Sequence, residues 1–215
     1  MMKSIQLILL LAFILFSSFT FSQSYVGVFI GMNSSKLTGD APANSFYNSF
    51  MGINAGVNID LKLAKSLKLS LQPSYSQEGT KISYNVSGQE EPVDSIKIRL
   101  NYFSFPILLK VATANNRFYA IGGFETGFLL NSFISSHDVK EDIKVDVKSY
   151  NLAIHFGVGL RIPIGFPNLY VEGRYAQGII NLTDEPLDTD IIPRVKTNGF
   201  KLLVGIEFPL QKSNK

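Results

Sequence analysis

The chain lacks cysteine and tryptophan, and few of its residues are charged. Asp, Glu, Lys and Arg make up 17% of its 215 residues, against about 25% in an average soluble domain. Without cysteine the protein cannot be a disulfide-stabilised scaffold, and 46% apolar residues are too many for a disordered chain. The net charge is only +3 and no run of Lys or Arg exceeds two residues, so nothing indicates nucleic-acid binding.

A long apolar run occurs only at the N-terminus, over residues 5–16. Lys3 precedes this run, and Thr20, Phe21 and Ser22 form a small-x-small cleavage site before Gln23. We therefore predict a cleaved signal peptide at residues 1–22 and a mature domain at residues 23–215. The alternative, a membrane anchor, would need roughly 20 apolar residues, and the run is shorter. No comparably long run follows, so no transmembrane helix is expected.

Alternation with a period of two residues is the main structural signal of the mature chain. In residues 150–162 every second residue is large and apolar, and the residues between are Asn, Ala, His, Gly and Arg. A strand with one dry and one wet face alternates in this way. Eight segments share the pattern: 26–33, 51–61, 67–76, 98–111, 118–128, 150–162, 169–178 and 200–208. In the fourth segment the apolar row changes face near Tyr102, which predicts a β-bulge or an exit from the apolar layer there.

The connections between these segments alternate in length. Short ones lie near residues 62–66, 112–116 and 163–167, and long polar ones near 34–48, 77–95, 131–149 and 179–196. If successive strands are antiparallel, all short turns lie at one end and all long loops at the other. Bacterial outer-membrane barrels have this arrangement, with the short turns in the periplasm. We therefore predict an all-β fold, an eight-stranded antiparallel up-and-down transmembrane β-barrel integral to the bacterial outer membrane.

The composition of the two faces indicates which of them meets lipid. The polar row consists of Gly, Ser, Asn and charged residues, and the apolar row of large aliphatic and aromatic residues. A soluble barrel would need many more charged residues outside, whereas the interior of eight strands is just wide enough for side chains to fill. We expect the apolar row to face lipid. Two interfacial aromatic girdles are predicted from residues near the strand ends: Tyr75, Tyr102, Tyr150, Tyr119, Tyr170 and Phe208.

The inward row predicts an ionic network inside the lumen. Its members are Glu125, His155, Arg161, Glu172, Arg174 and Glu207. A two-residue turn at Gly165 and Phe166 would place Gly159 opposite Glu172 and Gly157 opposite Arg174, so that ionic side chains fill the space that the glycines leave. Opposite charges in a confined interior can satisfy one another. The network is expected to plug the lumen; the alternative is a proton or ion path.

No catalytic, cofactor-binding or metal-binding residues are predicted, and the protein is expected not to be an enzyme. His155 and His137 form no recognisable metal-ligand set. Nucleotide-binding and serine-hydrolase motifs are absent from the sequence. Acid–base residues for a hydrolase at the outer rim are available, although their spacing is not diagnostic: His137, Asp138, Asp184, Asp188 and Asp190.

The loop at residues 137–148 alternates acidic and basic residues with valine and isoleucine. It could extend two strands as a hairpin or form a flexible cap. Either arrangement presents charge to the outside, which suits lipopolysaccharide, divalent ions or a protein partner, or simple solvation.

Several motifs resemble the PorT-like outer-membrane β-barrel family of gliding bacteria that use type IX secretion. They are Tyr-Phe-Ser-Phe-Pro-Ile-Leu-Leu-Lys at 102–110, Gly-Gly at 122–123, Gly-Val-Gly-Leu at 157–160, Glu-Gly-Arg-Tyr-Ala-Gln-Gly at 172–178 and Leu-Val-Gly-Ile-Glu-Phe at 203–208. The resemblance implies a barrel in a Gram-negative cell envelope and an association with secretion or gliding. We expect a non-enzymatic structural or protein-interaction role, with the lipid bilayer, lipopolysaccharide and envelope proteins as partners. The alternatives are a narrow channel or small-solute transporter and an outer-rim membrane hydrolase.

Overall fold

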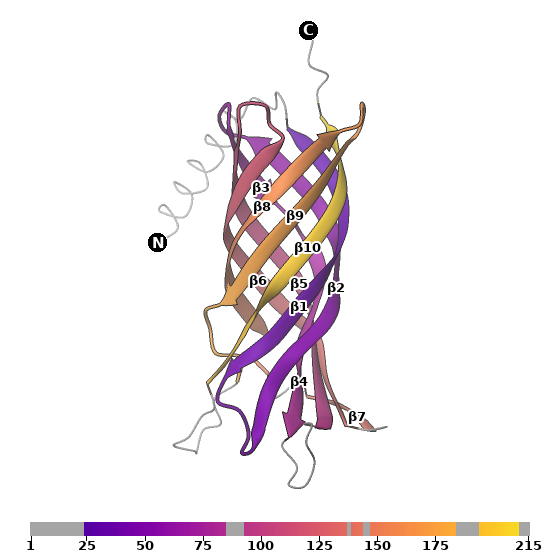
Figure 1. Ribbon diagram of the computed structural model, residues 1–215, viewed down its shortest axis with the longest axis vertical. Coiled ribbons are helices and arrows are strands. Elements are labelled where there is room, and N and C mark those ends of the chain that lie inside the picture. The colour runs from indigo at the N-terminus through magenta and orange to yellow at the C-terminus, as the bar shows by residue number, and fades with distance from the viewer. Residues whose placement is uncertain (1–23, 85–92, 137–138, 144–146, 184–193, 211–215) are drawn as a thin grey trace, which may run out of the picture.

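A closed ring of tilted strands forms the molecule (Figure 1). The computed structural model describes residues 24–84, 93–136, 139–143, 147–183 and 194–210. This part of the chain contains ten strands: β1 (Tyr25–Gly39), β2 (Ser45–Lys62), β3 (Leu67–Leu71), β4 (Ser74–Tyr84), β5 (Val93–Ala112), β6 (Phe118–Ser136), β7 (Val139–Asp142), β8 (Tyr150–Pro163), β9 (Asn168–Gly178) and β10 (Val195–Pro209). None of the described residues form a helix long and apolar enough to cross a bilayer. The predicted signal peptide lies outside the described residues.

Antiparallel pairing closes the ring. β1 pairs with β2 on one side and with β10 on the other, from Tyr25 opposite Pro209 to Gly39 opposite Val195. β3 and β4 occupy one position between β2 and β5, while β7 pairs only with β6. The ring of the described chain therefore has eight positions, and the predicted eight-stranded antiparallel barrel is confirmed.

The large apolar residues face outward. Leu202 is 57% exposed and Phe156 is 55% exposed, whereas Arg174 and Glu207 are 2% and 1% exposed. Since burial alternates along each strand, the charged row lies inside the ring. The predicted assignment of the two faces is confirmed.

The strands are longer at the long-loop end than the sequence pattern predicted. β1 continues to Gly39 and β2 begins at Ser45, so the first connection comprises residues 40–44 instead of 34–48. β6 continues to Ser136 and pairs with β7 across the third predicted loop. In Figure 1 the strand β7 lies at the lower end and β3 at the upper, short-turn end. In these extensions polar residues occur on both faces of the strands, so the alternation of apolar and polar residues that predicted the strands is absent there.

The turn between β8 and β9 also differs from the prediction. Pro163 and Asn168 are the last paired residues, so the turn has four residues, 164–167, and not two. Gly165 has a φ of +106°, which a residue without Cβ adopts readily. The register is nevertheless the predicted one, with Gly157 opposite Arg174 and Gly159 opposite Glu172.

An irregularity lies beside Tyr102, as predicted. The register between β5 and β6 shifts between Asn101 and Tyr102, and the extra residue, Leu130, lies on β6. The inward row of β5 itself continues without interruption through Leu100, Tyr102 and Ser104. The apolar residues upstream of Phe103 thus face the lumen because the lumen itself becomes apolar there.

Candidate functional site in the barrel lumen

Acidic and basic side chains inside the barrel are equal in number. Among the described residues, the buried acids are Asp60, Glu78, Glu125, Glu172 and Glu207, and the buried bases are Lys68, Lys110, Arg161, Arg174 and Lys201. His155 is also buried. All six residues of the predicted network are therefore in the lumen. The prediction omitted Asp60, Glu78, Lys68, Lys110 and Lys201, although their parity on their strands could have placed them inside.

Lys110 lies at the centre of the first group of ion pairs. Its Nζ is 3.1 Å from Asp60 Oδ1 and 2.9 Å from Glu172 Oε1. Glu172 also pairs with Arg174, whose guanidinium donates to Gln72 Oε1 at 2.6 Å. Each carboxylate thus faces more than one donor, which offsets the cost of removing it from water.

Arg161 completes this group at the short-turn end. It pairs with Glu207, and its Nη2 is 3.6 Å from Asp60 Oδ2. Together with Lys110, Glu172 and Arg174 these residues form what we call the Lys110 cluster. The cluster holds three acids and three bases, so its formal charge is zero.

A second group of ion pairs lies further toward the long-loop end. Lys201 Nζ is 2.8 Å from Glu125 Oε1 and 3.1 Å from Glu78 Oε1. His155 Nε2 is 3.2 Å from Glu125 Oε2, and Ser104 donates to Glu125 at 3.3 Å. In this Lys201 cluster a single lysine lies between two buried carboxylates.

Lys68 differs from the other lumen bases. Its Nζ has no hydrogen-bond partner among the described residues and lies 4.3 Å from the centroid of the Tyr25 ring. A cation over an aromatic face gains part of the electrostatic stabilisation that an ion pair provides. Lys68 therefore provides a comparison for the paired lysines.

Three predicted girdle tyrosines lie inside the barrel. Tyr102, Tyr119 and Tyr170 are buried, so the girdle prediction is wrong for them, while Tyr150 and Phe208 are exposed. The tyrosines fit inside because glycines make room. A Cβ atom on Gly159 would overlap the Tyr119 ring, and one on Gly205 would overlap the Tyr170 ring. Tyr119 then donates to Glu172 Oε1 at 2.9 Å.

We expect Gly159→Ala to destabilise the barrel, because its methyl group must displace the Tyr119 ring from a filled interior. Overpacking of this kind costs about 1–3 kcal/mol. The measurement is the urea midpoint of the heat-modifiable folded band on gels. Gly122→Ala is the control, since the nearest atom to its added Cβ is 3.9 Å away. Equal midpoints for the two variants would show that the glycine is not required for packing.

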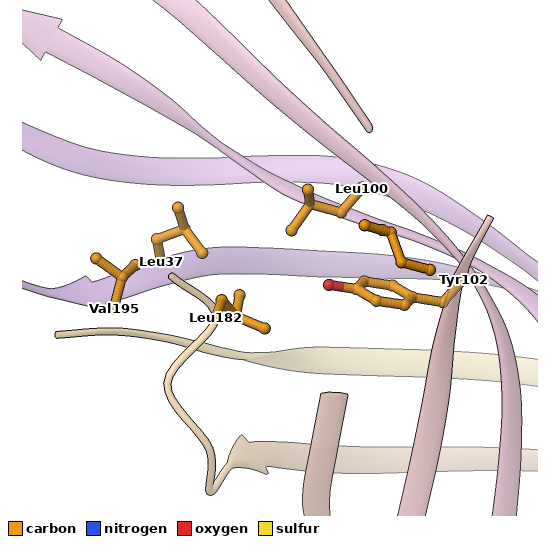
Figure 2. Close-up of a cluster of buried hydrophobic side chains, with 6 residues drawn as sticks. Leu37, Leu100, Tyr102, Leu182 and Val195 are labelled. Carbon is orange, nitrogen blue, oxygen red and sulfur yellow. The ribbon is translucent and has the colours of Figure 1, made fainter. Parts of the chain in front are cut away.

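An apolar cluster lies inside the barrel toward the long-loop end. Figure 2 shows Leu37, Leu100, Tyr102, Leu182 and Val195 converging from different elements. Two backbone hydrogen bonds hold Leu182 in place. Its N–H donates to Val195 O at 2.8 Å, and its carbonyl accepts from Lys148 N at 2.8 Å. Leu182 thus lies among the inward side chains at this end of the barrel.

Little space is left beside the Lys201 cluster. The hollow lined by Glu78, Lys201, Asn33, Ser35 and Thr197 has a volume of about 10 Å³. A single water needs about 10–15 Å³. This hollow therefore has room for about one water molecule and not for a hydrated ion.

The described residues contain no group of three His, Asp or Glu side chains placed to hold a metal ion. The rim residues considered for acid–base catalysis lie outside the described residues: His137, Asp138, Asp184, Asp188 and Asp190. The described lumen residues pair their buried charges with one another in two clusters.

Comparison with known proteins identifies the architecture. The family described as outer membrane protein beta-barrel domain matches residues 21–184. No curated protein matches the chain. Among solved structures, Ail, the attachment invasion locus protein of Yersinia pestis, is 17% identical over 86% of this chain and 99% of its own, with a TM-score of 0.44.

Two other solved structures also match this chain over most of its length at low sequence identity. Neisserial surface protein A is 12% identical over 86% of this chain and 96% of its own, with a TM-score of 0.48. The outer membrane protease OmpT from Escherichia coli is 12% identical over 90% of this chain and 98% of its own, with a TM-score of 0.42. Since the family match spans most of the chain, the protein belongs to the outer membrane protein β-barrel domain family and is an integral protein of the outer membrane.

Proposed function

We propose that the protein is a non-enzymatic envelope barrel whose lumen is closed by its own side chains. The equal number of buried acids and bases in the described chain carries this proposal. A conducting pore needs a continuous water-filled path, whereas here the carboxylates of both clusters face lysine or arginine side chains that occupy the lumen. The apolar cluster around Leu182 adds a second barrier.

The outer extension of the barrel supports an interaction role. β2, β4 and β6 continue beyond the outward apolar residues, and β6 and β7 form a hairpin there. Glu141 and Asp142 on β7 are exposed. Such a charged hairpin suits contact with lipopolysaccharide, through bridging divalent ions, or with an envelope protein. The resemblance to PorT-like barrels supports an association with secretion or gliding.

Planar-bilayer recording tests whether the lumen is closed. We expect the purified wild-type protein to insert without steady conductance, because both ionic clusters and the apolar cluster block the path. A steady wild-type conductance that Arg174→Ala or Glu172→Ala abolishes would contradict the proposal and favour a channel or small-solute transporter. The heat-modifiable mobility of each variant shows that the inserted protein is folded.

The interaction role requires a separate test. Wild-type protein and the double variant Glu141→Lys, Asp142→Lys are used to pull down partners from detergent-solubilised envelope. We expect a partner protein or lipopolysaccharide that the wild type retains and the variant loses. Identical material from both proteins would show that the β6–β7 hairpin is not the contact surface.

A further inference from the structure

A row of small side chains crosses the outward face near the short-turn end. Val111, Ala120, Val158 and Gly173 are direct neighbours on β5, β6, β8 and β9. Apart from Gly173 and its two chain neighbours, no residue has an atom within 4 Å of the position where a Cβ of Gly173 would be. The hollow over this row has a volume of about 750 Å³. Three further apolar residues line it: Phe118, Leu160 and Val171.

The hollow continues in both directions along the barrel wall. Val158 and Gly173 also line a second hollow of about 490 Å³. Its other walls include Phe156, Tyr175 and Phe200, and Tyr175 lies with its ring centroid 5.2 Å from each of the other two rings. Because the hollows share lining residues, they form one elongated depression, which we call the Gly173 groove.

The groove reaches a basic rim at the short-turn end. Phe118 and Leu160 line a third hollow of about 250 Å³, and Arg117 lies at its edge. Arg117 and Lys65 are exposed at this rim. The sequences of the three short turns, residues 62–66, 113–117 and 163–167, contain no acidic residue. The rim thus favours an anionic group over a neutral or cationic one.

In an outer-membrane barrel the short turns face the periplasm. The end of the groove at Phe118 and Leu160 therefore lies in the phospholipid leaflet, with its basic rim at the level of the headgroups, and the groove runs from there toward the bilayer midplane at Gly173, which pairs with Leu202. Lipid tails that cross an unfilled hollow lose contacts with the wall, and a tail seated in the hollow regains them. The main hollow also falls within the about 300–1,000 Å³ of typical small-molecule sites.

We propose that the Gly173 groove binds one anionic phospholipid of the periplasmic leaflet. One acyl chain lies along the groove from Phe118 to the ring of Phe156, and the phosphate lies beside Arg117. This site is separate from the lumen and does not depend on whether the lumen is closed.

Native mass spectrometry of the folded protein in detergent micelles tests the site. The protein is titrated with phosphatidylglycerol and, in parallel, with phosphatidylethanolamine. We expect one bound phosphatidylglycerol, with about a fivefold preference that corresponds to one cation beside an anionic headgroup. Arg117→Gln should abolish the preference, and Lys65→Gln, on a neighbouring turn, should retain it.

The groove itself is tested by filling it. Gly173→Leu should remove binding of both lipids, whereas Gly122→Leu should leave it unchanged, since Gly122 is also outward and open but lies outside the three hollows. Ala120→Phe is a second filling variant in case Gly173→Leu does not fold. Absence of a bound lipid on the wild type, equal binding by the filled and control variants, or a preference that Arg117→Gln leaves intact would overturn the proposal.

Discussion

Replacing Lys201 with methionine is expected to lower the free energy of unfolding by about 3–5 kcal/mol, the usual result of breaking a buried ion pair from one side. The variant removes the one lysine between Glu78 and Glu125 and leaves two carboxylates in an interior with little room for water. The free energy is measured by urea titration in detergent micelles, with folding followed by gel mobility.

Lys68→Met is the matched control because Lys68 is also a buried lumen lysine but has no ion-pair partner at hydrogen-bond distance. The substitution removes the attraction between this cation and the Tyr25 ring, and it also removes the cost of burying the cation. Because the two effects oppose one another, we expect the free energy of unfolding to change by no more than about 1 kcal/mol. Equal losses for the two lysines would show that ion pairing does not stabilise the lumen.

Leu202→Arg is expected to destabilise the barrel in a bilayer by about 2–4 kcal/mol, the cost of an arginine on the lipid face near the midplane. Leu202 lies in the middle of β10 and is outward and exposed. Phe208→Arg, on the same face but near the end of the strand, should cost about 0–1 kcal/mol. Urea unfolding from phosphatidylcholine vesicles gives both values.

The difference in unfolding free energy between Leu202→Arg and Phe208→Arg tests whether the outer face meets lipid. A barrel whose outer face met water would tolerate arginine equally at both positions. Near-zero costs for both would therefore argue against membrane insertion, and a large cost only at Leu202 would support it.

The sequence alone was sufficient to predict the eight-stranded ring, its lipid-facing row and one strand register. Alternation of apolar and polar residues identifies a strand wherever one face is apolar and the other is polar, as in residues 150–162. The register of β8 on β9 followed from keeping Gly157, Gly159, Glu172 and Arg174 on one face.

Other features depended on information that alternation does not contain. Leu37 and Leu100 are apolar yet inward, because they belong to an apolar cluster inside the long-loop end of the barrel. Tyr119 looks like an interfacial residue in the sequence, and only its contact with Gly159 on a different strand explains its burial. Lys110 belongs to the motif used for the family resemblance, and its bridging role depends on Asp60 and Glu172 from distant strands.

Site-directed spin labelling tests the orientation of the two faces most directly, and the absence of native cysteine makes each label unique. Cysteines are introduced one at a time at Ala153, Ile154, Phe156 and Val158 of β8, and the labelled barrel is reconstituted in phosphatidylcholine vesicles. We predict frequent collisions with oxygen and rare collisions with a water-soluble nickel chelate at Ile154, Phe156 and Val158, and rare collisions with both at Ala153. Low oxygen accessibility at Phe156 and Val158, or high nickel accessibility there, would contradict the account.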